Sequence, residues 1–346
     1  MGEIQSRSFQ PPVRVGFQCS RLTPDDDLIS GRKLDGRHKF LRWMFLLVRK
    51  KHSWSPVLLA VELWRLLINI GKYREIFRLF KLKPFVEIAQ DNPGFSLKYL
   101  VPDYLARGFT GTECVSCFLH HYKRIHAALP ESVLRQILQG NITLYEVAEG
   151  GNRFAFTMGL PDRNVDKEGE LSLDLRVDGK KIFDLCFTIV PGWVLKSEAP
   201  EALLISRLQG LPGCCPQIKA ARKALNDYSP RILLLAALQG IGDALGVGEI
   251  EAVSATNQMS YIKGCSALFK NGYDGFFTKA GMVKTSVGFY SSPIPIAGKP
   301  LGLFRGRARL RARKRRANRQ QIRAACSDFL SKIGCRAADS TPGTLC

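Results

Sequence analysis

The stretch Arg207–Gly213 places an arginine, a glutamine and two glycines shortly before an expected helix that begins near Pro216. Backbone N–H groups of a glycine-containing loop, together with the positive end of the following helix, can bind phosphate groups. Arg207 and Lys219 would add fixed positive charge. The same residue types are also common in plain turns. The stretch therefore indicates either a phosphate-binding loop or a turn.

A second group of reactive side chains follows the pattern Cys114-x-x-Cys117-x-x-His120-His121. On a helix, Cys114, Cys117 and His121 share one face, and their sulfur and nitrogen atoms suit zinc. A fourth ligand would have to come from a distant part of the chain, so a buried apolar face is the preferred interpretation and no metal is expected. His121 could be a polar group within the helical region or an acid–base residue lining a cleft.

Two pairs of carboxylates, Glu168 with Glu170 and Asp174 with Asp184, are candidates for acid–base chemistry. They fall on expected turn and strand positions, which predicts that they face solvent. The sequence contains no G-x-S-x-G motif, and none of its cysteines stands in a typical catalytic context. A nucleophilic triad is therefore not expected.

The strongest concentration of charge lies between Arg305 and Arg323, which includes ten basic residues and no acidic one. We expect a helical tail that extends to about Ile333. Such a helix can bind the phosphates of DNA, RNA or membrane lipid electrostatically. Aromatic residues that would stack on bases are limited to Phe304 and Phe329. The alternative is a solvated helix face.

The composition agrees with a folded protein that has an anionic ligand or surface as its partner. Of the 346 residues, 45% are hydrophobic and 23% are charged, which excludes disorder throughout the chain. The 51 Lys and Arg residues outnumber the 30 Asp and Glu residues, giving a net charge of +21. Nucleic acid, a lipid surface and a phosphorylated cofactor all remain candidates on this ground.

The sequence predicts neither a signal peptide nor a transmembrane segment. Residues 1–12 contain no apolar run. The longest apolar stretch, Pro56–Ile70, is interrupted by Glu62 and Arg65 and is shorter than the ~20 residues that span a bilayer. We therefore expect a cytoplasmic protein with reduced cysteines, for which Arg305–Arg323 offers a peripheral contact to the inner membrane.

The periodicity of the chain changes along its length and suggests four regions. They are a flexible arm over residues 1–36, a helical domain over 37–140, an α/β domain over 141–300 and a basic helical tail over 301–346. In the second region, Tyr73–Leu82 and Thr112–Leu129 are expected helices, the first closed by Pro84 and the second capped by Thr110 or Thr112.

The third region begins with four expected strands of alternating polarity, whose tight turns predict an antiparallel meander. These strands are Ile142–Val147, Phe154–Met158, Leu171–Val177 and Phe183–Ile189, the last two joined by the turn Asp178-Gly179. Further helices are expected over 216–225, 230–245 and 259–269, with strands over 250–254, 276–277 and 287–290. The predicted fold class is α+β: a helical unit followed by a mixed sheet with an antiparallel meander and flanking helices.

The order of these pieces resembles the VirK/YbjX family of proteobacterial proteins over about residues 38–330. The resemblance implies links to envelope integrity, resistance to antimicrobial peptides, stress response and virulence, but no defined reaction. It rests on His120–Tyr122, Glu168–Leu173, Phe187-Thr188, Ile205–Gly210, Pro230–Leu234, Ile250–Ser254, Tyr273–Phe276 and the basic tail.

The meander, the R-x-x-G stretch and the following helix and strand also resemble the acetyl-CoA-dependent N-acyltransferase fold. This resemblance implies that Arg207, Gln209, Gly210 and Gly213 hold the phosphates of an acyl-CoA cofactor. Backbone N–H groups where the fourth strand splays would hold the thioester carbonyl, and Asp274 or His121 would deprotonate an amine. Pro212 stands where that motif has a small residue and lacks the N–H group.

Three functions follow as hypotheses from the sequence. The first is a VirK/YbjX-like envelope or stress factor that acts as an acyl-CoA-dependent N-acyltransferase. The second is a non-enzymatic basic protein that binds anionic membrane or nucleic acid. The third is an acyltransferase-like fold that serves as a scaffold.

Overall fold

The computed structural model of the chain describes residues 70–91, 95, 98–99, 104–163, 165–225 and 228–337. All of these residues belong to one compact unit. The arm expected over residues 1–36 and residues 37–69 of the expected helical domain lie outside them.

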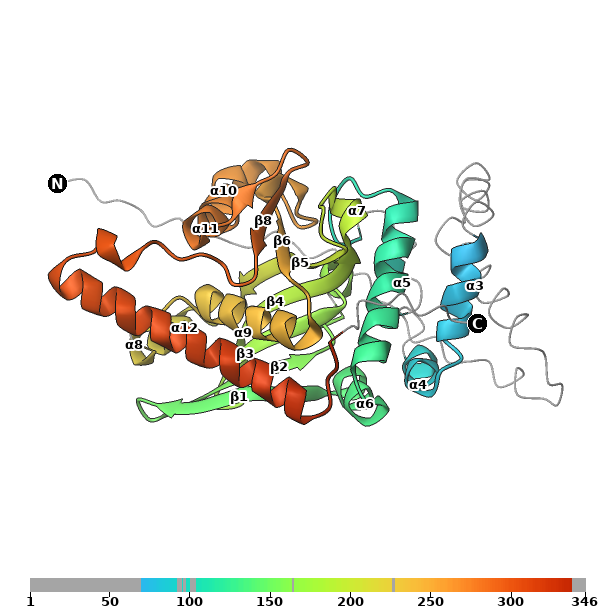
Figure 1. Cartoon of the computed structure of the whole chain (residues 1–346), viewed down its shortest axis with the longest axis horizontal. Helices are drawn as coiled ribbons and strands as arrows, with labels where there is room; N and C mark the ends of the chain where they lie inside the picture. Colours follow the sequence, from blue (N-terminus) through green and yellow to red (C-terminus); the bar gives the residue numbers. More distant parts are fainter. Residues whose placement is uncertain are drawn as a thin grey trace, which may run out of the picture. The chain divides into compact units, whose positions relative to one another are not determined.

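A sheet of eight strands lies at the centre of the described residues (Figure 1). The strands are β1 Asn141–Glu149, β2 Asn152–Gly159, β3 Leu171–Val177, β4 Lys180–Pro191, β5 Glu201–Gly210, β6 Glu249–Val253, β7 Val283–Lys284 and β8 Phe289–Pro293. Their order across the sheet is β1-β2-β3-β4-β5-β6-β8-β7. Only β5 and β6 run parallel, and every other neighbouring pair is antiparallel. The predicted mixed α+β class is confirmed.

The α-helices of the described residues are α3 Ile70–Leu79, α4 Lys83–Asp91, α5 Gly111–Ala128, α6 Glu131–Gln139, α7 Gly192–Leu195, α8 Cys215–Ala224, α9 Pro230–Leu245, α10 Ser266–Gly272, α11 Asp274–Ala280 and α12 Gly306–Lys332. Helices α9 and α12 lie across this sheet, and helices α3 to α6 lie beside one end of it (Figure 1). Helices α9 and α12 lie side by side, α9 over β3, β4 and β5, while α12 reaches β1. Helix α5 packs against β4, α3 packs against α5, and α4 packs against α6. Within the described residues, no helix combines the length and apolarity needed to cross a bilayer.

The antiparallel meander appears as predicted in β1 to β4. Leu171, Leu173 and Leu175 of β3 are buried in the hydrophobic core, as their alternation indicated. Asp178 and Gly179 form the turn between β3 and β4, and both have positive φ angles, of 49° and 81°. This is the backbone conformation that a two-residue hairpin turn requires.

The structure adds a fifth antiparallel strand that the sequence interpretation did not include. Arg207, Gln209 and Gly210 were expected in a loop after the fourth strand, but they lie within β5. This strand pairs with β4 on one side and β6 on the other. Residues 202–205 are all buried, so both faces of the strand are covered there, and these residues form a continuous apolar run without alternation.

Three other expected elements differ in the structure. The helix expected over residues 259–269 begins only at Ser266, and the expected strand at Phe276-Phe277 is part of helix α11. Tyr273 and Phe277, one helical turn apart, are both buried there. The helix expected over Tyr73–Leu82 and closed by Pro84 ends at Leu79. Pro84 itself lies in the first turn of α4, where the absence of its N–H group breaks no helical hydrogen bond.

Helix α5 begins as predicted, with Thr110 as its N-cap. The Thr110 side chain accepts a hydrogen bond from the Glu113 backbone, and the Glu113 carboxylate accepts one from the Thr110 backbone. This capping box satisfies two backbone donors at the start of the helix. His121 and Tyr122, further along the same helix, are both buried.

Candidate functional site

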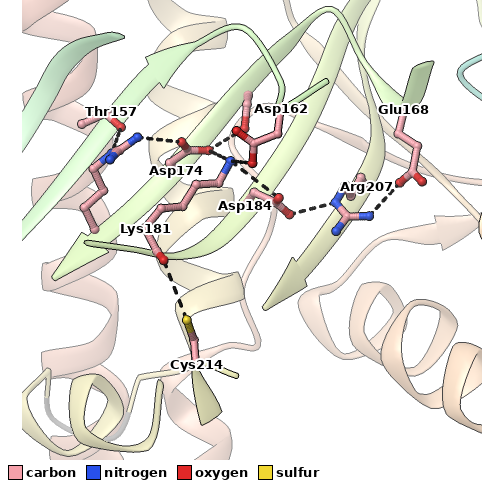
Figure 2. Close-up of polar contacts among 10 residues, drawn as sticks. Thr157, Asp162, Glu168, Asp174, Lys181, Asp184, Arg207 and Cys214 are labelled. Atoms are coloured by element: carbon pink, nitrogen blue, oxygen red, sulfur yellow. Dashed lines mark hydrogen bonds and ion pairs between the residues drawn. The ribbon is translucent and has the colours of Figure 1, made fainter. Parts of the chain in front are cut away.

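Arg207, the leading phosphate-binding candidate, is already engaged by two carboxylates. Its Nε donates to Asp184 Oδ1 at 3.0 Å, and its Nη1 donates to Glu168 Oε2 at 3.1 Å (Figure 2). Burial opposes the positive charge, but Asp184 and Glu168 outweigh it and raise the pKa of Arg207. A phosphate group would have to displace these carboxylates in order to bind the guanidinium.

The same ionic network continues across β3 and β4 through Lys181. Its Nζ lies 3.0 Å from Asp174 Oδ1, 3.1 Å from Asp162 Oδ2 and 3.7 Å from Asp184 Oδ2 (Figure 2). Arg176 Nη2 lies 3.4 Å from the second oxygen of Asp174. Four carboxylates and three cations therefore share one face of the sheet.

The expectation that Glu168, Asp174 and Asp184 face solvent is wrong, because all three are buried. The segment that joins β2 to β3 crosses this face of the sheet, so that Asp162 reaches Lys181 and Glu168 reaches Arg207. Burial raises the pKa values of Glu168 and Asp184, whereas Arg207 lowers them. Every carboxylate has a cation within 4 Å, so the network offers no unpaired base and instead ties the strands together.

Glu170, the remaining carboxylate of the two pairs, lies in a separate buried cluster. It is 0% exposed, accepts hydrogen bonds from the hydroxyls of Tyr104 and Tyr122, and lies 2.6 Å from Lys98 Nζ. Burial raises its pKa, and Lys98 opposes this effect. The sequence does not indicate this cluster, because its four members are far apart along the chain and share no spacing pattern.

Gln209 and Gly210 are packed against neighbouring side chains. Gln209 Nε2 donates to the hydroxyl of Tyr273 at 2.6 Å. A Cβ atom on Gly210 would lie 2.7 Å from Ile218 Cδ1 and 3.2 Å from the ring of Phe183. No room remains beside Gly210 for even a methyl group without a shift of these side chains.

Gly213 and Asp274 have different surroundings. Gly213 has a positive φ of 76°, and a Cβ atom there would meet nothing within 4 Å. Asp274 Oδ1 accepts a hydrogen bond from the Ala255 backbone at 2.8 Å. Asp274 directly follows Tyr273, so the structure brings Gln209 and Asp274 into the same region.

Tyr273 lies beside the part of β5 that has no parallel partner. Strands β5 and β6 pair only at Leu203–Ile205 with Ile250–Ala252, while β5 continues to Gly210. The buried Tyr273 ring stacks on Phe269, and burial raises the pKa of its hydroxyl to about 12. This neutral aromatic side chain therefore occupies the space next to Gln209.

His121 is buried at a different place along β4. Its Nδ1 accepts a hydrogen bond from the Ile189 backbone at 3.1 Å, whereas Arg207 is the register partner of Cys186. Burial lowers the pKa of His121, and Lys98 and His120 add to this effect. The imidazole is thus neutral and carries its proton on Nε2, which has no hydrogen-bond partner among the described residues.

Cys114 and Cys117 share the buried face of α5 with His121. In the part of the chain that the structure describes, no group of three or more His, Cys, Asp or Glu side chains could hold a metal ion. The thiol of Cys117 has a raised pKa because it is buried, and Cys114 adds to this effect. A protonated, buried thiol is a poor nucleophile.

The basic tail forms helix α12, whose two halves have different surroundings. In the second half, Ile322, Cys326 and Leu330 are buried at a spacing of four residues, which places them on one face toward α9. The first half is largely exposed. Its exposed basic residues, with the preceding Arg305, are Arg305, Arg307, Arg309, Arg311, Arg313, Lys314 and Arg315.

Comparisons with known proteins identify one family. A family model described as "Protein of unknown function (DUF535)" matches residues 60–328, well over half of the chain. Neither the curated proteins nor the solved structures include a match. VirK/YbjX proteins belong to this same family, which confirms the expected kinship at that level. The chain therefore belongs to the DUF535 family.

Proposed function

We propose that this protein binds anionic phospholipid surfaces through the exposed first half of α12. The observation that carries the proposal is the unpaired state of five arginines at this end of the helix. They form no ion pair with any described residue and are Arg305, Arg307, Arg309, Arg311 and Arg313. Anionic lipids attract each such residue by about 1 kcal/mol.

The spacing of these arginines places their positive charges close enough to repel one another along the unbound helix. Arg307 and Arg311, and Arg309 and Arg313, are each four residues apart within α12 and therefore adjacent on the helix surface. Each like-charged pair destabilises a helix by roughly 0.2–0.5 kcal/mol. Contact with a negatively charged surface would replace this repulsion by attraction, so the helix is best stabilised when it is bound.

Two exposed leucines favour a membrane over nucleic acid as the partner. Leu303 is 72% exposed and lies two residues before Arg305, and Leu310 is 67% exposed and lies between Arg309 and Arg311. Apolar side chains flanked by basic ones are typical of helices that lie in the headgroup region of a bilayer. Between Arg305 and Arg323 there is no aromatic residue that would stack on bases. A peripheral position at the inner membrane would also suit the envelope role that the VirK/YbjX resemblance implies.

Vesicle co-sedimentation of the full chain tests this proposal. We expect binding to phosphatidylcholine vesicles that contain phosphatidylglycerol, little binding to pure phosphatidylcholine, and release as salt rises. Replacement of the five arginines by glutamine keeps the side-chain length and helix propensity but removes the charges. This variant should lose most of the binding.

A matched control removes five exposed basic residues from other elements, namely Arg74, Arg78, Lys83, Lys263 and Lys270. It has the same net charge as the α12 variant and should bind like the natural chain. Equal loss in both variants would mean that overall charge, not α12, is responsible. If duplex DNA displaces the protein from vesicles at stoichiometric amounts, nucleic acid is the preferred partner and the proposal fails.

The parallel pairing of β5 and β6 supports acyl-CoA-dependent N-acyl transfer as a second candidate function. An acyl-CoA cofactor would lie where β5 extends beyond β6, with its phosphates near Arg207, Gln209, Gly210 and Gly213. Tyr273 would have to leave this place first. A thermal-shift series with acetyl-CoA and longer acyl-CoA species checks the candidate, because a bound ligand must stabilise the folded state. The absence of any shift at millimolar concentration would exclude it.

A further inference from the structure

A cavity of about 340 Å³ lies between α9, α12 and residues 295–298. Its volume falls within the range of small-molecule binding sites. One wall is apolar, and the other is formed by polar side chains of α12. The apolar wall includes Ile232, Leu235, Ala236, Pro295, Ile296 and Ala297, and the polar wall includes Arg316, Arg319, Gln320 and Arg323.

Two of the arginines converge on Gly298. A Cβ atom on Gly298 would lie 3.4 Å from Nη2 of Arg316 and 3.6 Å from Nη2 of Arg319. The two nitrogens therefore lie within about 7 Å of each other. One anionic group placed beside Gly298 can contact both guanidiniums.

No acidic side chain among the described residues compensates the charges of this pair. Arg323 is neutralised by Asp243, with Nη2 donating to Oδ1 at 2.7 Å. Arg316 Nη2 donates to the neutral carbonyl of Lys299 at 3.0 Å, and neither Arg316 nor Arg319 has an acidic partner among the described residues. Burial lowers the pKa of Arg319, and the charge of Arg316 lowers it further. Two partly buried positive charges at short range favour an anion.

We propose that this cavity binds a phosphate monoester that carries a small apolar substituent. Arg316 and Arg319 bind the phosphate oxygens, because the guanidinium fork matches their geometry. The substituent packs against Leu235 and Ile296 on the opposite wall. This second contact distinguishes the ligand from inorganic phosphate.

The cavity uses none of the five arginines that the membrane proposal invokes. Soluble ligands can therefore be tested without vesicles, and vesicle binding can be tested in variants of the cavity. Failure of one binding event does not imply failure of the other.

Substitution at Gly298 is the sharpest test. In Gly298→Asp, the new carboxylate lies between the two guanidiniums and takes the place of the ligand anion. Gly298→Asn has nearly the same shape without the charge. We expect the Asp variant to melt at a higher temperature than the Asn variant and to bind n-hexyl phosphate at least tenfold more weakly.

A second pair of variants separates the cavity from the rest of α12. Arg316→Gln with Arg319→Gln should weaken n-hexyl phosphate binding at least tenfold in calorimetry. Arg309→Gln with Arg313→Gln changes the charge equally outside the cavity and should leave binding intact. Hexanol should not bind, and inorganic phosphate should bind at least tenfold more weakly than n-hexyl phosphate.

Dihexanoyl phosphatidic acid, used as a soluble monomer, identifies the source of the phosphate. Tighter binding than n-hexyl phosphate supports a lipid headgroup, and weaker binding supports a soluble phosphorylated metabolite. The proposal is overturned if n-hexyl phosphate does not bind at millimolar concentration, if Gly298→Asp binds it like Gly298→Asn, or if inorganic phosphate binds equally well.

Discussion

Asp174 and Asp184 are direct partners across β3 and β4, and the ammonium group of Lys181 lies 3.0 Å from the first carboxylate and 3.7 Å from the second. Like charges opposite each other destabilise a strand pair, and here both are buried. Burial disfavours the charge of Lys181, but the two aspartates outweigh this effect and raise its pKa. The positive charge of Lys181 therefore offsets the repulsion between the two carboxylates that this strand register places opposite each other.

Replacing Lys181 by methionine should destabilise the protein by about 3 kcal/mol at pH 7, because two buried carboxylates lose their shared cation. The deficit should shrink toward acidic pH, as the carboxyl group of Asp184, whose pKa burial raises, takes up a proton. Urea unfolding measures both effects. Lys180→Met, at an exposed neighbouring position, is the control and should change stability by less than about 0.5 kcal/mol. Adding Asp174→Asn to Lys181→Met should restore part of the loss, and no restoration would contradict this account.

Glu251 makes the stability depend on pH in the opposite sense to most carboxylates. It is 2% exposed, and its Oε2 has no hydrogen-bond partner among the described residues. Burial, with a contribution from the charge of Glu249, raises its pKa from 4.5 to about 8. Between these values the folded protein holds a proton that the unfolded chain has released, so stability falls as pH rises through this range. Below about pH 4.5 the full stabilisation is present.

The variant Glu251→Gln should remove this dependence. It should match the natural chain near pH 4 and exceed its stability by about 4 kcal/mol at pH 8. The measurement is the difference in the free energy of unfolding between the two proteins from pH 4 to pH 8.5. Glu149→Gln, at an exposed position, should leave the difference flat. A flat difference for Glu251→Gln as well would show that this carboxyl is ionised in the folded state.

Tyr122→Phe should cost about 2 kcal/mol, because it removes a hydrogen bond to the buried carboxylate of Glu170. Tyr104 and Lys98 remain, so the fold should persist. Tyr145→Phe is a matched control, since Tyr145 is only half buried and should cost less than about 1 kcal/mol. Denaturant midpoints measure both values, and equal losses would rule out a special role for the Glu170 cluster.

Gly240→Ala should separate α9 from α12 at their closest approach. A Cβ atom at position 240 would lie 2.2 Å from the carbonyl oxygen of Arg323 and 3.0 Å from Cys326 Cβ. Alanine favours a helix by up to about 1 kcal/mol, but overpacking of this contact should cost more, with a net loss of about 2 kcal/mol. Gly275→Ala in α11 meets only ordinary contacts and should be neutral or stabilising in thermal unfolding. A stabilised Gly240→Ala variant would contradict the close helix contact.

The elements that sequence reasoning located correctly have a strong local signal. The meander was recognisable because apolar and polar residues alternate along its strands, and α5 because Thr110 and Glu113 form its capping box. Strand β5 was missed because residues 202–205 are a continuous apolar run, which lacks the alternation on which the prediction relied. The helix at Phe276-Phe277 was missed because two adjacent aromatics fit a strand as well as a helix.

The surroundings of the candidate residues were not predictable in the same way. Arg207 stands beside glycines in the sequence, but it pairs with Glu168 and Asp184, which other segments supply. The basic tail was evident from its composition, whereas only packing against α9 divides it into an exposed half and a half that lines a cavity. Local periodicity is a property of consecutive residues and is readable along the chain. Ion pairing and cavity formation depend on which distant segments meet, and the folded core decides that.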